Sequence, residues 1–115
     1  MAFRESEARE CERIIHAFVE RRRPAPHLRQ ELDLGYRLVD QSVEIFEIRP
    51  YWKNPQEILE IRVAKATYVR SRDVWRIFWV RQDLKWHRYD PRPEVKRLEE
   101  FVAIVDEDRH GCFFG

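Results

Sequence analysis

Basic and aromatic side chains are interleaved through residues 62–92, and this segment holds the strongest chemical pattern of the chain. It contains nine basic residues against three acidic ones, a net charge of +6 in a 115-residue protein whose overall charge is +1. Single-stranded nucleic acid is bound by this combination, because bases stack on aromatic rings while phosphates pair with cations. The pattern therefore predicts a nucleic-acid-binding surface in the middle of the chain.

A β-hairpin is expected in this segment, with a two-residue loop at Asp83-Leu84. In that register Arg81 faces Trp86, and Trp79 faces Arg88. Because paired side chains share one face of a sheet, the hairpin predicts an arginine–tryptophan face with cation–π contacts. A three-residue loop would shift the register and undo this sorting. The residues predicted to bind nucleic acid are Arg70, Arg72, Trp79, Arg81, Trp86 and Arg88.

The same residues also allow a purely structural interpretation. Tryptophan is highly buried on average, so these rings could pack beneath helices while the arginine stems cover the rim of the sheet. The sequence does not decide which face of the sheet the helices cover, and both interpretations stay open.

A second candidate set, His87, Tyr89 and Lys65, would suit a metal-independent ribonuclease. His87 could act as a general base and Tyr89 as a proton donor, while Lys65 and Arg88 would hold a phosphate. In the expected register, however, Arg88 lies on the face opposite His87 and Tyr89. A half-buried histidine bonded to its neighbours is the simpler interpretation of this position.

Neither a metal site nor a cofactor is predicted. His110 and Cys112, with Asp106 and Asp108 nearby, could offer ligands, but they lack the paired spacing of zinc sites. The chain has only three glycines, which excludes a glycine-rich phosphate-binding loop.

Two amphipathic helices are expected at the ends of the chain. Apolar residues at helical spacing predict the first helix from Ser6 to about Arg22, and Pro24 ends it. Pro91 and Pro93 are interpreted as the start of the second helix. Its apolar stripe consists of Val95, Leu98, Phe101, Val102 and Val105.

Between the helices, runs of β-branched and aromatic residues predict an antiparallel meander of about five strands. The expected strands cover residues 34–39, 43–49, 58–70, 74–81 and 85–90. With 43% apolar residues the chain can form one core, so we expect a single α+β domain over residues 1–115. The adjacent Phe113 and Phe114 are expected to dock onto this domain, since two exposed rings at a chain end are unfavourable.

Several blocks of sequence resemble one known family. They are Val43–Pro50, Ala64–Val69, Lys85–Tyr89 and the ending Gly111–Gly115. Together they resemble a short bacterial family described only as a domain of unknown function. The resemblance implies a bacterial, stand-alone protein of this length, and it supplies no activity, cofactor or catalytic residue.

The leading hypothesis is therefore a non-enzymatic module that binds single-stranded nucleic acid. A protein-interaction module is the alternative, because an antiparallel sheet has edges that can pair with a partner strand or a second copy in a homodimer. The cytoplasm is the expected location, since the start of the chain lacks the apolar stretch of a signal peptide. No apolar run approaches the roughly 20 residues of a membrane span, so no membrane partner is expected.

Overall fold

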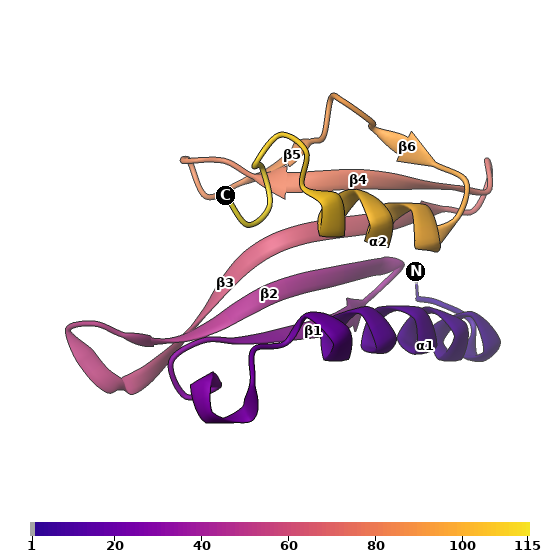
Figure 1. Ribbon diagram of the computed structural model, residues 1–115. Coiled ribbons are helices and arrows are strands. Elements are labelled where there is room, and N and C mark those ends of the chain that lie inside the picture. The colour runs from indigo at the N-terminus through magenta and orange to yellow at the C-terminus, as the bar shows by residue number, and fades with distance from the viewer. Residues whose placement is uncertain (1) are drawn as a thin grey trace.

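Two helices pack against one face of an antiparallel sheet in the computed structural model, which describes residues 2–115 (Figure 1). The helices are α1 (Glu5–Arg22) and α2 (Leu98–Glu107), and a short 3₁₀ helix, η1 (Pro26–Leu28), follows α1. The strands are β1 (Asp33–Val39), β2 (Ser42–Tyr51), β3 (Asn54–Val69), β4 (Val74–Val80), β5 (Trp86–Arg88) and β6 (Glu94–Val95). The predicted α+β class is confirmed.

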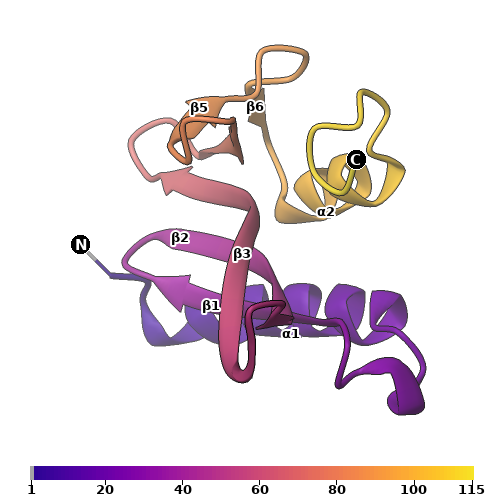
Figure 2. The same ribbon diagram turned by 90° about the vertical axis from the view of Figure 1, so that its left-hand side faces the viewer.

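The first five strands form a meander in the order β1-β2-β3-β4-β5, and β6 pairs with β4 off this path. β3 is the longest strand, and Figure 2 shows it running from the layer of β1, β2 and α1 to the layer of β4 and α2. The hairpin of β2 and β3 continues beyond the body of the protein at the left of Figure 1. We call this projecting part, residues 49–58, the arm.

The expected start of the second helix at Pro91 and Pro93 is wrong. The Glu100 carboxylate accepts hydrogen bonds from the backbone N–H groups of Arg97, at 2.9 Å, and Lys96, at 3.0 Å. These bonds satisfy free donors at the start of a helix and fix it at Leu98. The preceding residues remain extended, and Glu94 pairs with Arg76 of β4 to form β6.

Both predicted apolar stripes lie in one core. In α1 the buried residues are Cys11, Ile15, Phe18 and Val19. In the second stripe all five predicted residues are buried, and they are Val95, Leu98, Phe101, Val102 and Val105. On the sheet, Val43, Ile45, Ala64, Ala66 and Ile77 meet these helices and are buried. We call the face of the sheet that points away from both helices the open face. Because side chains alternate between the two faces of a strand, it carries the strand residues that do not point into this core.

An ion pair fastens the start of α1 to the end of β3. The Arg70 guanidinium donates two hydrogen bonds to the Glu7 carboxylate, at 2.6 and 3.0 Å. These bonds are the main cause that lowers the pKa of Glu7 from 4.5 to about 2. The Glu7 side chain also accepts a hydrogen bond from the Arg4 backbone N–H at 2.8 Å, so one carboxylate starts the helix and attaches it to the sheet.

We predict that this ion pair contributes a stability that acid removes. Because folding lowers the pKa of Glu7, its contribution is complete above about pH 4.5 and is lost as pH falls towards about 2. Glu7→Gln should lower the melting temperature at pH 7, and its melting temperature should fall less than that of the wild type between pH 4.5 and 2. The control is Glu5→Gln, in an exposed ion pair with Arg9, which should change little. Identical pH profiles for Glu7→Gln and wild type would contradict the prediction.

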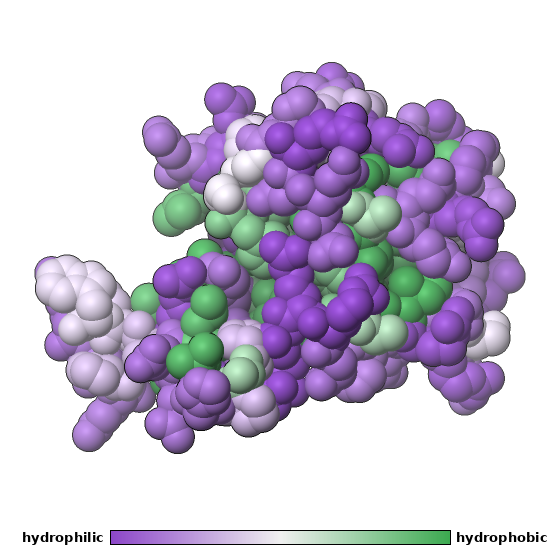
Figure 3. All heavy atoms as spheres, viewed as in Figure 1, coloured by the Kyte–Doolittle hydropathy of each residue, from purple (hydrophilic) through white to green (hydrophobic). Residues whose placement is uncertain are grey.

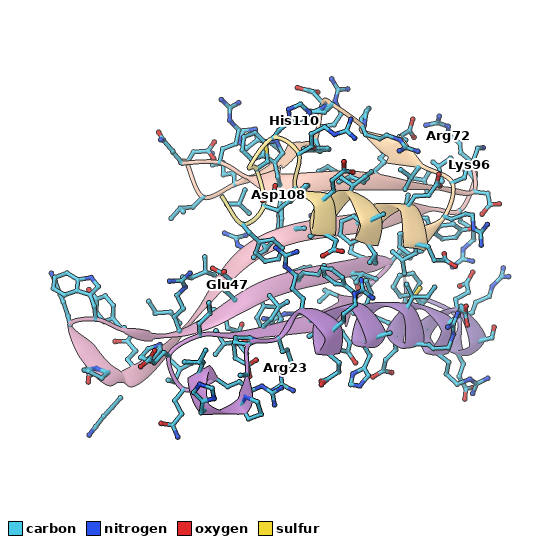
Figure 4. All side chains as sticks on the ribbon, in the orientation of Figure 1. Arg23, Glu47, Arg72, Lys96, Asp108 and His110 are labelled. Carbon is cyan, nitrogen blue, oxygen red and sulfur yellow. The ribbon has the colours of Figure 1, made fainter. Side chains whose placement is uncertain are left out.

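The C-terminal residues fold back onto the domain, as the sequence predicts. Asp108 ends α2 in the left-handed conformation, with φ of 44°, and Figure 4 shows it where the C-terminal segment turns back. Its carboxylate accepts hydrogen bonds from the N–H groups of Phe113, at 3.0 Å, and Phe114, at 2.8 Å. The Phe113 ring is 8% exposed and lies 4.9 Å from the Tyr89 ring, and the Arg22 guanidinium covers the Phe114 ring at 4.0 Å.

We predict that Phe113→Ala lowers the free energy of unfolding by about 3 kcal/mol, the usual cost of removing a buried phenyl ring. Phe114→Ala is the matched control and should cost less, because its ring is only half-buried. Deleting residues 112–115 should lower the stability at least as much as Phe113→Ala. Urea unfolding measures all three, and an unchanged midpoint after the deletion would show that the docked segment adds no stability.

Within residues 2–115, neither helix combines the length and the apolar character that a membrane crossing requires.

Candidate nucleic-acid interface

The β4–β5 hairpin differs from the expected one by one residue of register. The observed pairs are Phe78 with Arg88, Trp79 with His87, and Val80 with Trp86. The expected facing of Arg81 with Trp86 and of Trp79 with Arg88 is therefore wrong. Paired residues share a face of the sheet, and neighbouring residues of one strand do not. Because Trp79 pairs with His87, the neighbour of Trp86, the two tryptophans lie on opposite faces of the sheet.

Residues 81–85 form a longer loop than expected, and Asp83 accounts for its shape. The Asp83 carboxylate accepts a hydrogen bond from the Lys85 backbone N–H at 3.0 Å and contacts the His87 Nε2 atom at 2.8 Å. Leu84 takes a positive φ of 62°, and its N–H donates to the Arg81 carbonyl at 2.8 Å. This local turn replaces the tight two-residue turn and moves β5 by one position.

The structural interpretation of the tryptophans is correct for two of them. Trp75 is 7% exposed and packs against the rings of Phe3 and Tyr68 on the face beneath the helices. Trp79 shares that face and is half-buried against the core. The exposed Arg81 lies above Trp79, with the guanidinium 5.7 Å from the ring centre. Trp79 and Arg81 are thus separated from Trp86, which lies on the open face.

A different set of residues meets on the open face around Lys65. The Lys65 ammonium lies 4.9 Å from the centre of the Phe78 ring and 5.0 Å from that of Trp86. The Arg62 guanidinium contacts the same Trp86 ring at 5.5 Å and donates a hydrogen bond to the Leu84 carbonyl at 2.7 Å. We call Arg62, Lys65, Phe78 and Trp86 the open-face cluster. Its cations and rings come from β3, β4 and β5.

Ion pairs divide the nine basic residues of the segment 62–92 into two groups. Five are paired with carboxylates, namely Arg70 with Glu7, Arg72 and Arg76 with Glu94, Arg88 with Asp90 and Arg92 with Glu100. Figure 4 shows Arg72 at the end of the sheet beside β6. Among the described residues 2–115, the other four make no ion pair, and they are Arg62, Lys65, Arg81 and Lys85. The basic side chains that form no ion pair therefore lie around Trp86 and in the loop 81–85.

Of the six residues predicted to bind nucleic acid, Trp86 alone belongs to the open-face cluster. Arg70, Arg72 and Arg88 are held by carboxylates, while Trp79 and Arg81 lie on the other side of the hairpin or in its loop. Arg62 was missed because strict alternation along β3 places it on the face opposite Lys65. Phe78 was missed because the expected register of the hairpin places it on the face opposite Trp86. Lys65 was assigned to the ribonuclease set.

The environment of Lys65 is partly apolar. Burial lowers the pKa of its ammonium group from the usual value, Arg62 acts in the same direction, and Glu44 opposes both. Glu44 is the residue opposite Lys65 on β2. The Lys65 side chain is therefore a cation held at a fixed position by aromatic rings rather than a fully solvated one.

Almost the whole chain matches one family model. The model describes a domain of unknown function, DUF3024, and it covers residues 3–115. The protein belongs to the DUF3024 family. No curated protein and no solved structure matches the chain.

The ribonuclease set of this DUF3024 protein is not brought together. His87 contacts Asp83 and lies on the face of Trp79, whereas Lys65 lies on the open face opposite Phe78. Tyr89 is buried against Phe113, and burial raises the pKa of its hydroxyl group. A phosphate held by Lys65 would thus be separated from both expected proton-transfer groups by the sheet.

An open pocket of about 400 Å³ lies between the start of α1, the start of α2 and the sheet. Its apolar wall includes Phe3, Tyr68 and Trp75, and burial raises the pKa of the Cys11 thiol beside them to about 11. The carboxylates at its mouth are already paired, as Glu7 is with Arg70. The Cys11 side chain is therefore a protonated thiol at neutral pH, and the carboxylates that line the pocket are held by arginines. Among residues 2–115 no group of three or more potential metal ligands is found.

We predict that the protein does not cleave RNA in the presence of a metal chelator, because His87, Tyr89 and Lys65 lie apart. A labelled single-stranded RNA should remain intact after long incubation, as judged by gel electrophoresis. The matched control preparation is His87→Ala, which should give the same result. Cleavage by the wild type that disappears in His87→Ala would contradict the prediction and restore the ribonuclease hypothesis.

Proposed function

We propose that this protein binds single-stranded nucleic acid on the open-face cluster. The observation that carries the proposal is the position of Lys65 between the Phe78 and Trp86 rings, with Arg62 on the same Trp86 ring. Cations and aromatic faces are held together on a sheet surface that neither helix covers. Single-stranded nucleic acid needs this pair of features, one for its phosphates and one for its bases.

Charge supports the proposal through the cations that carry no ion pair. Among residues 2–115, Arg62, Lys65, Arg81 and Lys85 form no ion pair that a phosphate would have to break, although Glu44 lies opposite Lys65 and Asp83 lies in the loop 81–85. Arg70, Arg72 and Arg88 would have to give up Glu7, Glu94 and Asp90 before they could bind a phosphate. We therefore assign phosphate contacts on the open face to Arg62 and Lys65 rather than to Arg70, Arg72 and Arg88.

A single strand fits this surface better than a duplex. Base stacking on Trp86 and Phe78 requires unpaired bases whose faces are accessible. Reading of a duplex, in contrast, usually places a helix or a two-stranded ribbon in the major groove. The open-face cluster is neither of these, because its residues come from the three strands β3, β4 and β5.

The cytoplasm is the proposed compartment, which is supported by the free thiols of Cys11 and Cys112, because reduced cysteines persist there.

We predict that a fluorescein-labelled single-stranded oligothymidylate binds with an affinity that falls as salt rises. With Arg62 and Lys65 in contact with phosphates, the logarithm of the binding constant should fall with the logarithm of salt concentration with a slope of about −1.4. Arg62→Gln and Lys65→Gln should each reduce that slope by about 0.7. Trp86→Leu should weaken binding by about 1–3 kcal/mol, the usual contribution of one stacked base. Fluorescence anisotropy measures each value.

Two matched variants control this experiment. Arg9→Gln removes an arginine that pairs with Glu5 on α1, and Trp52→Leu removes an exposed tryptophan at the tip of the arm. Both should bind like the wild type. No binding of the oligonucleotide at 20 mM salt, or equal losses in the controls and in the cluster variants, would overturn the proposal.

A further inference from the structure

The arm leaves one edge of β3 without a neighbouring strand. β1 pairs with β2 only as far as Ile48, opposite Asp33, and β4 pairs with β3 only from Ala64 onwards. Residues 54–63 of β3 therefore have β2 on one side and, within residues 2–115, no strand on the other. This free edge carries unpaired backbone N–H and C=O groups in a row, which is the template for pairing with another chain.

Apolar side chains are exposed along this same edge. Ile58 is 58% exposed and Ile61 is 42% exposed, and they lie on opposite faces of the strand. Trp52 at the tip is 79% exposed. In Figure 3 the tip of the arm at the left is white to purple, and green, hydrophobic atoms lie where the arm joins the body. A two-stranded ribbon is marginally stable in water, and a third strand is what usually stabilises it.

We propose that the third strand is supplied by a second copy of this chain. The two β3 strands pair antiparallel along residues 56–62, about a two-fold axis at Leu59. Such an interface uses the same surface of both copies and closes as a dimer. In this register Leu59 faces Leu59 of the second copy, Ile58 faces Glu60, Glu57 faces Ile61, and Gln56 faces Arg62.

The charges of the edge favour antiparallel pairing of identical strands. A parallel, in-register arrangement would set Glu57, Glu60 and Arg62 each against itself, and like charges directly opposite are destabilising. The antiparallel register about Leu59 places no like charges directly opposite. The one close pair of like charges is diagonal, between the two copies of Glu60, and Arg37 of the same chain already forms an ion pair with Glu60.

Apolar contact also selects this register. Leu59 at the axis would meet Leu59 of the second copy and, on the diagonal, its Ile61, so four aliphatic side chains would gather on one face. Ile58, the most exposed aliphatic residue of β3, would meet its own copy diagonally on the other face. Diagonal neighbours in a sheet lie about 7–8 Å apart at the backbone, within reach of aliphatic side chains. The two strands at the ends of the sheet order, β1 and β5, offer less. In β1, Arg37 is paired with Glu60 and Leu34 is buried in the core, and β5 has only 3 residues.

The test is the dissociation constant of the dimer, measured by sedimentation. We expect the wild type to be a dimer and Leu59→Lys to raise the dissociation constant at least tenfold, because it sets two ammonium groups against each other at the axis. Val39→Lys is the matched control on β1, where the residue is also partly exposed, and it should remain a dimer. Circular dichroism verifies that both variants fold.

A cross-link provides a second measurement that does not depend on weakening the interface. In a Cys112→Ser background, Leu59→Cys should form an intermolecular disulfide on mild oxidation, because the two residues face each other. The remaining Cys11 is buried. A monomeric wild type at 100 µM, dissociation by Val39→Lys but not by Leu59→Lys, or no cross-link at Leu59 would each overturn the proposal.

Discussion

The irregularity in β3 at Val63 is the constraint on which the rest of the structure depends. Ala64 pairs with Ile45 while Arg62 pairs with Phe46, so Val63 is the extra residue of a β-bulge. Without it, Arg62 and Lys65 would lie on opposite faces, because they are three residues apart and strands alternate. The bulge turns Val63 into the core, where it is 3% exposed, and brings Arg62 to Trp86. One inserted residue thus completes the core and the open-face cluster together.

The limits of sequence-based prediction follow from the same kind of local event. The buried stripes of α1 and α2 were correctly predicted, since helical periodicity persists over several turns. The docking of Phe113 followed from the cost of exposing it. In contrast, the register of β4 and β5 depends on how Asp83 folds one loop, the bulge depends on pairing with β2, and β6 is two residues long. None of these leaves a periodic signal, and each changes which side chains share a face. The fold was therefore predictable, whereas the composition of the open-face cluster was not.

Charge pairing explains how an almost neutral protein can present a positive surface. Exposed ion pairs contribute little to stability, but each one cancels the field of an arginine that a binding partner would otherwise meet. The charges of Arg70 and Arg72 are cancelled in this way by Glu7 on α1 and Glu94 on β6. The cations left over are those that fall near the loop 81–85. The net charge of a segment of sequence counts paired and unpaired basic residues alike. It therefore indicates the region that is proposed to bind but not the residues that make the contacts.

The geometry of the proposed dimer connects the arm to the open face. A two-fold axis that pairs β3 strands antiparallel must stand perpendicular to the sheet, so both open faces lie on the same side of a continuous sheet. Arg62 belongs both to the cluster and to the end of the paired edge. The two clusters would therefore flank the paired arms and face one partner. A single strand that spans both would bind the second cluster at the high effective concentration set by the first, which compensates for the small number of free cations in each copy.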